Sequence, residues 1–191
     1  MPTTLNLEQE LKDRGAILDG HFRLSSGRHS NRFIQKFRIL EDPAILGPVA
    51  VQIADAFRQA RPTLVVSAAI GGILLGYEVA RALGTKAIFV EKENGVPVLR
   101  RGFRIDPTDR VLVVEDVVTT GGSVKEVLDL VRAGGATIVG VGVIVQRAHV
   151  DFGVRTHHLL EMPIDSYDAS KCPQCERGEP IADPGSRRTS A

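Results

Sequence analysis

The chain has 191 residues, of which 43% are hydrophobic and 25% are charged, and its formal net charge is +1. This length suits one domain with a buried core, while the near-neutral charge argues against a dedicated nucleic-acid binder. We expect a cytoplasmic protein, because no apolar run approaches the ~20 residues of a membrane span, the N-terminus lacks a signal-peptide pattern, and two cysteines make no disulfide framework.

The N-terminal part predicts a short helix, a strand and a polar segment. Asn6, with Gln9 three residues later, resembles a capping box that opens a helix to Arg14. A strand is expected over residues 20–24. Residues 25–33 are polar, basic and interrupted by glycine, which leaves two interpretations open: a solvent-exposed hairpin tip, which is common, or a hood of hydrogen-bond donors over a ligand.

Helical and strand patterns alternate from Pro43 onward, a residue that suits a helix start. Helices are expected over residues 43–59, 73–83 and 123–133. Buried strands are expected around Val65, Ile88, Val113 and Val141, each in a strand–helix unit. This alternation predicts an α/β fold with a central, mostly parallel sheet flanked by helices. An edge strand is expected over residues 157–162, and an irregular tail from about residue 166.

Four loops are expected to meet at one edge of this sheet. In open parallel sheets, ligands bind beyond the carboxyl ends of the strands. The loops that this rule brings together are residues 68–72, 91–95, 115–123 and 146–147. The candidate site is therefore the crevice along that edge.

The strongest signal lies in residues 111–123, where a short buried strand, Val111 to Val114, precedes two acids and a Thr-Thr-Gly-Gly-Ser loop. Small residues and hydroxyls before a helix N-terminus present backbone N–H groups to a phosphate. Carboxylates beside that phosphate would repel it unless they face sugar hydroxyls or a metal ion. The alternative is a plain turn in which Thr119 or Ser123 caps the helix. The segment is not a Walker loop, because the Gly-Lys-Ser/Thr ending is missing. Because the strand, the two acids and the loop occur together, we favour binding of a phosphorylated sugar.

The whole motif resembles the phosphoribosyl-diphosphate binding motif of the type I phosphoribosyltransferases. The resemblance implies that Glu115 and Asp116 hold the ribose 2- and 3-hydroxyls, while the following loop wraps the 5-phosphate. Residues 68–72 are expected to form a nest of N–H groups for the diphosphate, or alternatively to allow close strand–helix packing. The residues expected at this substrate are Glu115, Asp116, Val117, Val118, Thr119, Thr120, Gly121, Gly122, Ser123, Ile70, Gly71 and Lys92.

Residues 20–30, 71–84 and 99–103 resemble orotate phosphoribosyltransferases, and with the central motif the resemblance runs from about Leu7 to Arg147. It implies that the backbone of Phe33 and Ile34 meets the orotate ring, and that Thr119 and Arg147 meet its carboxylate side. The implied reaction joins orotate to 5-phosphoribosyl 1-diphosphate and releases orotidine 5-monophosphate and diphosphate, in pyrimidine biosynthesis. Mg²⁺ is expected on the diphosphate.

The resemblance also implies an organisation and an assembly. One domain is expected over residues 1–191, with a hood of about 1–40 plus the C-terminal segment, a core of about 43–150 and an irregular tail of about 166–191. A homodimer is implied, in which a mobile loop closes over the partner subunit's site. No nucleic acid and no membrane are expected as partners.

The chain departs from the best-known family members in ways that resemble a short-loop bacterial or archaeal branch. Ser25 stands where many have lysine, and Ile70-Gly71 where many have Tyr-Lys. Lys92 matches a lysine at the base of the catalytic loop, but Glu91 replaces the preceding arginine. The expected catalytic residues are Lys92, Asp116, Glu115, Arg100 and Arg101, with Arg104 as a further available cation. The alternative for the arginines is the solvated face of a hairpin.

Two readings outside this activity stay open. A phosphoribosyltransferase for another base would keep the fold, whereas a regulator that senses the diphosphate sugar and binds nucleic acid is disfavoured by the charge and by both retained acids. Cys172 and Cys175 have zinc-knuckle spacing, but only half of a ligand set is obvious. His157 and His158 could complete the set, although adjacent histidines usually point apart. We expect redox pairing or ordinary thiols there, and no protein-bound metal. His21 and His29 are expected to be structural parts of the hood.

Overall fold

The computed structural model describes residues 7–24 and 27–184. The chain divides into two compact units: unit 1 comprises residues 1–38 and 163–191, and unit 2 comprises residues 39–162. The expectation of one domain over the whole chain stays a prediction. Asn6 and Ser25, which the sequence singles out, lie outside the described residues. Within the described part of the chain, no helix combines the length and the apolar character that a membrane crossing requires.

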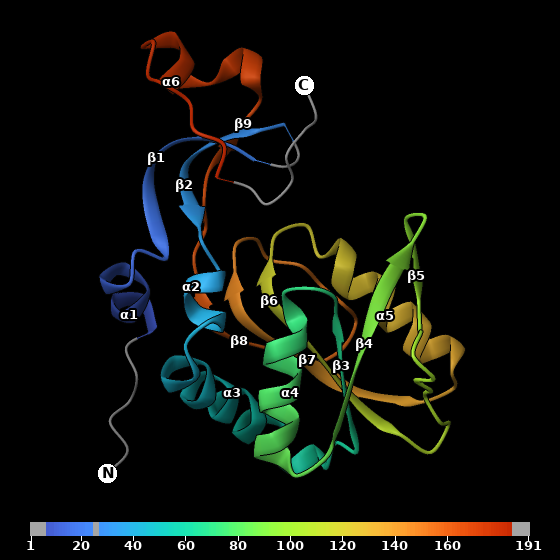
Figure 1. Ribbon diagram of the computed structural model, residues 1–191. Coiled ribbons are helices and arrows are strands. Elements are labelled where there is room, and N and C mark those ends of the chain that lie inside the picture. Colours follow the sequence, from blue (N-terminus) through green and yellow to red (C-terminus); the bar gives the residue numbers. More distant parts are fainter. Residues whose placement is uncertain (1–6, 25–26, 185–191) are drawn as a thin grey trace. The chain divides into compact units, whose positions relative to one another are not determined.

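Unit 2 is built on a sheet with the strand order β5-β4-β3-β6-β7-β8 (Figure 1). Its strands are β3 (Leu64–Ala68), β4 (Lys86–Glu93), β5 (Val96–Val98), β6 (Arg110–Val118), β7 (Thr137–Gln146) and β8 (Thr156–Glu161). All neighbouring pairs are parallel except β4 with β5. The predicted edge strand over residues 157–162 is confirmed as β8.

The helices of unit 2 lie on both faces of this sheet. They are α3 (Pro43–Phe57), the short η1 (Arg58–Ala60), α4 (Gly72–Leu83) and α5 (Gly122–Ala133), while α2 (Phe37–Leu40) spans the border between the units. Strand residues such as Val66 and Val113 share one hydrophobic cluster with Val127 of α5. Because successive strand residues point to opposite faces, Ser67 and Val114 face the other way, toward Gly76 of α4. The predicted fold class is therefore confirmed.

Two predicted strand–helix units are wrong. The strand around Val141, β7, is followed by the parallel strand β8 and not by a helix. The strand around Ile88 is followed by the antiparallel strand β5 and not by a helix, with Glu93 opposite Val96. The two residues between them, Asn94 and Gly95, have φ values of 52° and 82°. Asn-Gly with both residues at positive φ is the typical two-residue hairpin turn. The Asn94-Gly95 pair therefore indicates a hairpin at this point, although the alternation of strands and helices predicts a helix.

Unit 1 combines the two ends of the chain. It contains α1 (Leu7–Asp13), β1 (Ile17–Arg23), β2 (His29–Ile34), β9 (Ser166–Tyr167), the short η2 (Ala169–Lys171) and α6 (Pro173–Glu176). The three strands form an antiparallel sheet in the order β1-β2-β9. Two expectations are corrected here. Residues 29–34 form a strand instead of a loop, because they pair with β1 from Ile17 to Arg23. Part of the tail after residue 166 is regular, because Ser166 and Tyr167 pair with the start of β2.

Candidate functional site

The loops of the central motif begin at one edge of the unit 2 sheet. Ala68 at the end of β3 is level with Val90 of β4, and Val118 at the end of β6 is level with Gln146 of β7. Since these strands are parallel, residues 69–71 and 119–121 leave the sheet on the same side. The predicted convergence is confirmed for residues 68–72, 115–123 and 146–147. The sequence predicts residues 91–93 as part of a loop, but they extend strand β4 beyond Val90.

Glu115 and Asp116 lie inside strand β6 and not after its end. The sequence predicts a strand that ends at Val114, but pairing with β7 extends it to Val118, with Glu115 opposite Val143. Both acids are buried. The Glu115 carboxylate accepts a hydrogen bond from the Asp116 N–H at 3.1 Å, and the Asp116 carboxylate accepts one from the Val117 N–H at 2.6 Å. The rigid strand therefore holds both carboxylates in place.

The loop after β6 leads into the N-terminus of α5, which has no side-chain cap. Gly121 occupies the N-cap position, and no side chain there forms a capping hydrogen bond. The alternative in which Thr119 or Ser123 caps the helix is therefore wrong. Thr119, Thr120, Gly122 and Ser123 are exposed. Backbone N–H groups of an uncapped first turn, with the partial positive charge of the helix end, are suited to a phosphate.

Gly121 is required by geometry at this point. Its φ of +77° lies in the left-handed region, and a Cβ atom there would lie 2.8 Å from Val150 and 2.9 Å from Phe152. Only glycine adopts this conformation without cost and leaves room for these side chains. The glycine therefore fixes the path of the loop into α5.

The sequence predicts that the loop between β3 and α4 either binds the diphosphate or allows close strand–helix packing, and its residues differ in this respect. A Cβ atom on Gly72 would lie 2.9 Å from the Cβ of Ser67, so close strand–helix packing explains this residue. Ile70, by contrast, is 77% exposed, and the Ala69–Ile70 peptide bond is cis. The Ala69 N–H donates to the Val90 carbonyl at 2.8 Å, which fixes the start of the loop. Diphosphate binding by Ile70 and Gly71 stays a prediction.

Arg147 lies directly beside the end of the central strand. Its backbone N–H donates to the carbonyl of Val118, the residue before Thr119, at 2.8 Å. Its side-chain Nε is buried and has no hydrogen-bond partner among the described residues. Burial also lowers the pKa of the guanidinium. A buried guanidinium N–H without a partner is stabilised by an anion, so Arg147 is suited to a carboxylate.

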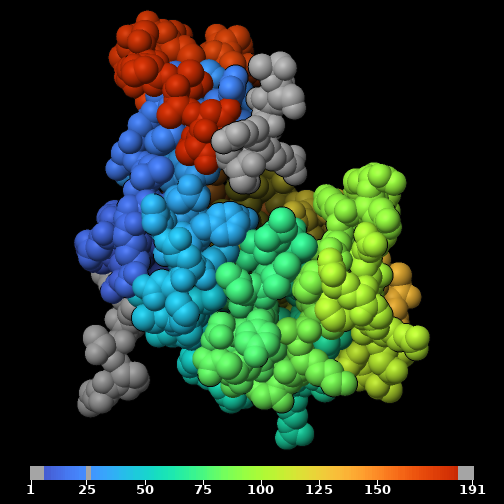
Figure 2. Space-filling model, in the orientation of Figure 1, coloured from blue at the N-terminus to red at the C-terminus, as the bar shows by residue number. Residues whose placement is uncertain are grey.

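The cations of the predicted catalytic loop are exposed and paired with acids. Lys92 lies 2.8 Å from the Glu126 carboxylate, Arg101 donates two hydrogen bonds to Glu91, and Arg100 is 3.6 Å from Glu93. The Arg101 hydrogen bonds hold the pKa of Glu91 below its usual range. Arg104 is exposed, and no ion pair of its side chain occurs within residues 27–184. Figure 2 shows α4 in green and the segment after β4 in yellow-green on the visible face of unit 2.

These exposed pairs cost little to break. An ion pair between solvated side chains contributes little to stability. Any of Lys92, Arg100 and Arg101 can therefore turn toward a diphosphate at small cost. The geometry does not show which of the three is the catalytic cation. Their catalytic role, and that of Glu115 and Asp116, stays a prediction.

Two further groups of residues lie in unit 1. Phe33 and Ile34 lie at the end of β2, opposite Leu18 and Ile17 of β1, and their contact with orotate stays a prediction.

No pattern in the sequence connects His21 and His29 with Cys172 and Cys175. The structure brings His21, His29, Cys172 and Cys175 together, and the proposed completion of the cysteine pair by His157 and His158 of β8 is therefore not needed. The Cys-x-x-Cys spacing was a visible signal, but its partners lie about 150 positions away.

The comparisons with known proteins agree with this geometry. Residues 38–159 match the family model described as a phosphoribosyl transferase domain. A protein of Pelotomaculum thermopropionicum named orotate phosphoribosyltransferase is 51% identical over 91% of this chain and 93% of its own length. The chain belongs to the orotate phosphoribosyltransferase family. A Thermotoga maritima member is 46% identical over 95% of this chain and 98% of its own length.

A solved structure of the same family shares the fold. The crystal structure of orotate phosphoribosyltransferase from Aeropyrum pernix has a TM-score of 0.69 and 30% identity, and the match covers 81% of this chain and 93% of that one. The resemblance that the central motif suggested is thus confirmed at the level of family and fold. In this member of the family, the β6–α5 segment supplies the two buried acids and the uncapped helix end.

Proposed function

We propose that this protein transfers the 5-phosphoribosyl group from 5-phosphoribosyl 1-diphosphate to orotate, giving orotidine 5-monophosphate and diphosphate in pyrimidine biosynthesis. The observation that carries this proposal is the uncapped N-terminus of α5 directly after a strand that holds Glu115 and Asp116. This pair of features suits a phosphate next to a polyhydroxylated ring. Membership of the orotate phosphoribosyltransferase family supports orotate as the acceptor.

The proposed reaction is a displacement at the anomeric carbon of the ribose. The C1–O bond breaks with its electron pair on the departing diphosphate, and a C1–N bond forms as the orotate ring nitrogen gives up its proton to that diphosphate. Such displacements pass through a state with positive charge on the ribose, as in glycoside hydrolysis. The carboxylates of Glu115 and Asp116 hold the ribose hydroxyls and stabilise that charge. Arg147 orients orotate through its carboxylate.

Mg²⁺ belongs to the same proposal. This ion takes oxygen ligands and is usually held by one or two carboxylates, water and substrate phosphates. Glu115 and Asp116 provide carboxylate oxygens at the site, so the residues present fit the ion, with most of its ligands coming from the diphosphate. When bound, the ion neutralises charge on the leaving diphosphate. Loss of turnover in a chelator, with recovery when Mg²⁺ but not K⁺ is added back, tests this requirement.

A homodimer is the assembly that we propose. Ile70, Leu74 and Tyr77 follow one another at intervals of four and three residues, which places the two helical residues on one face of α4. Their exposed fractions are 77%, 50% and 63%, so a second copy would remove a large apolar area from water. Light scattering on Leu74→Glu should then report monomers. Val51→Glu, at another exposed apolar position on α3, should leave the dimer intact; a dimeric Leu74→Glu variant would refute this interface.

The activity itself is tested by the ultraviolet absorbance of orotate. Absorbance should fall when 5-phosphoribosyl 1-diphosphate and Mg²⁺ are added to the protein, and Asp116→Asn should suppress the change. Turnover of a purine base with none of orotate would refute the acceptor while leaving the fold unaffected. Salt-dependent binding of DNA or RNA at micromolar concentration would favour the regulator instead. We also place the activity in the cytoplasm, which cell fractionation would test.

A further inference from the structure

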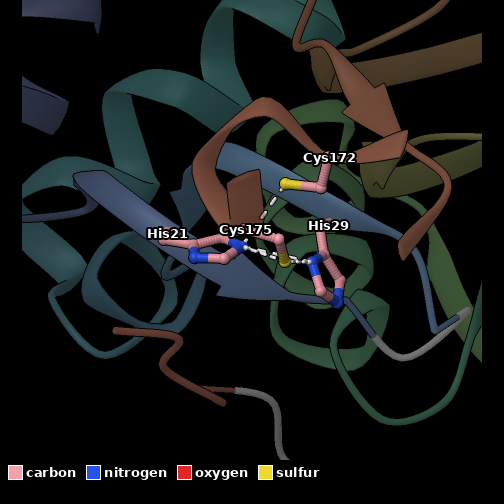
Figure 3. A group of neighbouring side chains, drawn as sticks. All are labelled: His21, His29, Cys172 and Cys175. Carbon is pink, nitrogen blue, oxygen red and sulfur yellow. Dashed lines mark hydrogen bonds between the residues drawn. The ribbon is translucent and has the colours of Figure 1, made fainter. Parts of the chain in front are cut away.

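Four side chains that can ligate a metal meet in unit 1. His21 lies on β1 and His29 on β2. Cys172 directly precedes the short helix α6, and Cys175 lies within it. One ligand atom from each residue lies within 4.8 Å of those of all the others. Figure 3 shows the four side chains directed toward one another from these separate segments. Neither the proposed reaction nor its substrates use any of them.

The distances within this cluster are those of neighbouring ligands around one small ion. Nε2 of His21 lies 3.1 Å from Nδ1 of His29 and 3.4 Å from the Cys172 sulfur. The Cys175 sulfur lies 3.2 Å from His29 Nδ1 and 3.6 Å from His21 Nε2. Tetrahedral zinc, with bonds of about 2.0–2.1 Å to nitrogen and 2.3 Å to sulfur, separates its ligands by roughly 3.3–3.8 Å. The ligand atoms are thus nearly in position.

A hydrogen bond from outside the cluster orients His21 for this role. Its Nδ1 lies 3.0 Å from the carbonyl oxygen of Glu179, which can only accept, so Nδ1 carries the proton. Nε2 then presents its lone pair to the cluster. An imidazole fixed in this way by a backbone carbonyl is the usual arrangement at a metal-ligating histidine. His21, His29 and Cys172 are buried, whereas Cys175 is exposed and provides a path of entry for an ion.

We propose that His21, His29, Cys172 and Cys175 bind one Zn²⁺ ion as a structural site. Two thiolates and two imidazoles complete a tetrahedral coordination and leave no open position, which distinguishes such a site from a catalytic one. The set also favours zinc over Mg²⁺ or Ca²⁺, which take oxygen ligands. This inference does not depend on the proposed transferase activity.

The structure also shows what the ion would stabilise. Strand β9 has two residues and α6 has four, which is too short for either to be stable alone. Gln174, between the two cysteines, donates hydrogen bonds to the Gly20 carbonyl and to Glu179, so α6 already contacts β1. A small unit with a limited core commonly needs a disulfide or a metal. The ion would connect the first strands of the chain to its C-terminal segment.

Metal analysis of the untagged protein tests the proposal. Elemental analysis after purification under reducing conditions should find one zinc per chain. Cys172→Ser and His29→Ala should lose it, whereas His158→Ala, a histidine outside the cluster, should retain it. The Co²⁺-substituted protein should show charge-transfer bands from thiolate and the intense visible bands of tetrahedral coordination. A wild-type protein that takes up no zinc when supplied with it would refute the site, as would a Cys172–Cys175 disulfide in the purified chain.

A second measurement avoids the case in which a variant simply fails to fold. A zinc-selective chelator added to the wild type, with Mg²⁺ kept in excess, should lower Tm by roughly 5 °C or more and expose the C-terminal segment to proteolysis. Adding Zn²⁺ should reverse both effects. An unchanged Tm after complete removal of the ion would contradict a structural role. Because the readouts are metal content and stability, a failure of orotate turnover would not affect the outcome.

Discussion

The Lys92 ammonium group lies 2.8 Å from the carboxylate of Glu126, so a strand residue of the predicted catalytic loop is paired with helix α5. If Lys92 moves to the diphosphate during the reaction, Lys92→Ala should lower kcat by about 10²-fold, the effect of removing one group that stabilises developing charge. Steady-state kinetics measures this. Glu126→Gln breaks the same pair while leaving the lysine, and it should keep kcat near that of the wild type. Equal losses in both variants would point to a structural pair instead.

Asp116 should act mainly on the transition state. Asp116→Asn keeps the size of the side chain and a hydrogen-bond acceptor but removes the negative charge next to the ribose. We expect kcat to fall by about 10²-fold or more while the affinity for 5-phosphoribosyl 1-diphosphate changes far less. Calorimetry and kinetics separate the two quantities. Asp129→Asn, on the exposed side of α5, serves as the control and should change neither. Parallel losses of affinity and kcat would assign Asp116 to ground-state binding.

The ion pair between Glu91 and Arg101 should make a small contribution to stability that depends on pH. Hydrogen bonds from Arg101 lower the pKa of Glu91 in the folded protein. The contribution is therefore present above the ordinary pKa of glutamate and is lost as the pH falls through the lowered value. Because the pair is solvated, its size should be small. Glu91→Gln should remove this part of the acid dependence in denaturant titrations at several pH values. An unchanged profile would show that the pair is not formed in solution.

Local signals predicted most helices of unit 2, but pairing across the chain decided the rest. Helix α3 begins at Pro43 after Asp42, whose side chain accepts a hydrogen bond from the Ala44 N–H. Neighbouring residues therefore determine where this helix starts. The placement of Glu115 inside β6 depends instead on β7, which no local pattern shows.

Unit 1 illustrates the same limit more strongly. His29 and Ser30 are polar and follow a glycine, which is typical of a loop, yet they form a strand that pairs with β1 on one side and with β9 on the other. Of these two partners, β9 lies at the other end of the chain. For the same reason, the Cys-x-x-Cys spacing indicates two possible metal ligands, whereas His21 and His29 become visible as the other two only in the folded chain.

Gly121 should be intolerant of substitution because of its backbone conformation and its close neighbours. Gly121→Ala places a Cβ in the left-handed region and within 2.9 Å of Val150 and Phe152. We expect a loss of about 1–3 kcal/mol in the free energy of unfolding, together with weaker binding of the diphosphate sugar as the loop shifts. Gly122→Ala is a matched control, since its nearest neighbour would be Thr120 at 3.8 Å. Denaturant unfolding measures the stability of both variants. Equal free energies of unfolding would show that the loop adapts to the added methyl group.

Arg147 should determine the affinity for orotate and not that for the sugar diphosphate. Its buried Nε has no partner among the described residues, and its backbone is held by Val118 beside the motif. A hydrogen bond to a charged group contributes about 1.5–3 kcal/mol, so Arg147→Ala should raise the KM for orotate roughly 10- to 100-fold. The KM for 5-phosphoribosyl 1-diphosphate should change little. Arg58→Ala, which removes an exposed arginine paired with Asp55, controls for the loss of a positive charge. If Arg147→Ala weakens both substrates equally, Arg147 supports the motif loop and does not bind the orotate carboxylate.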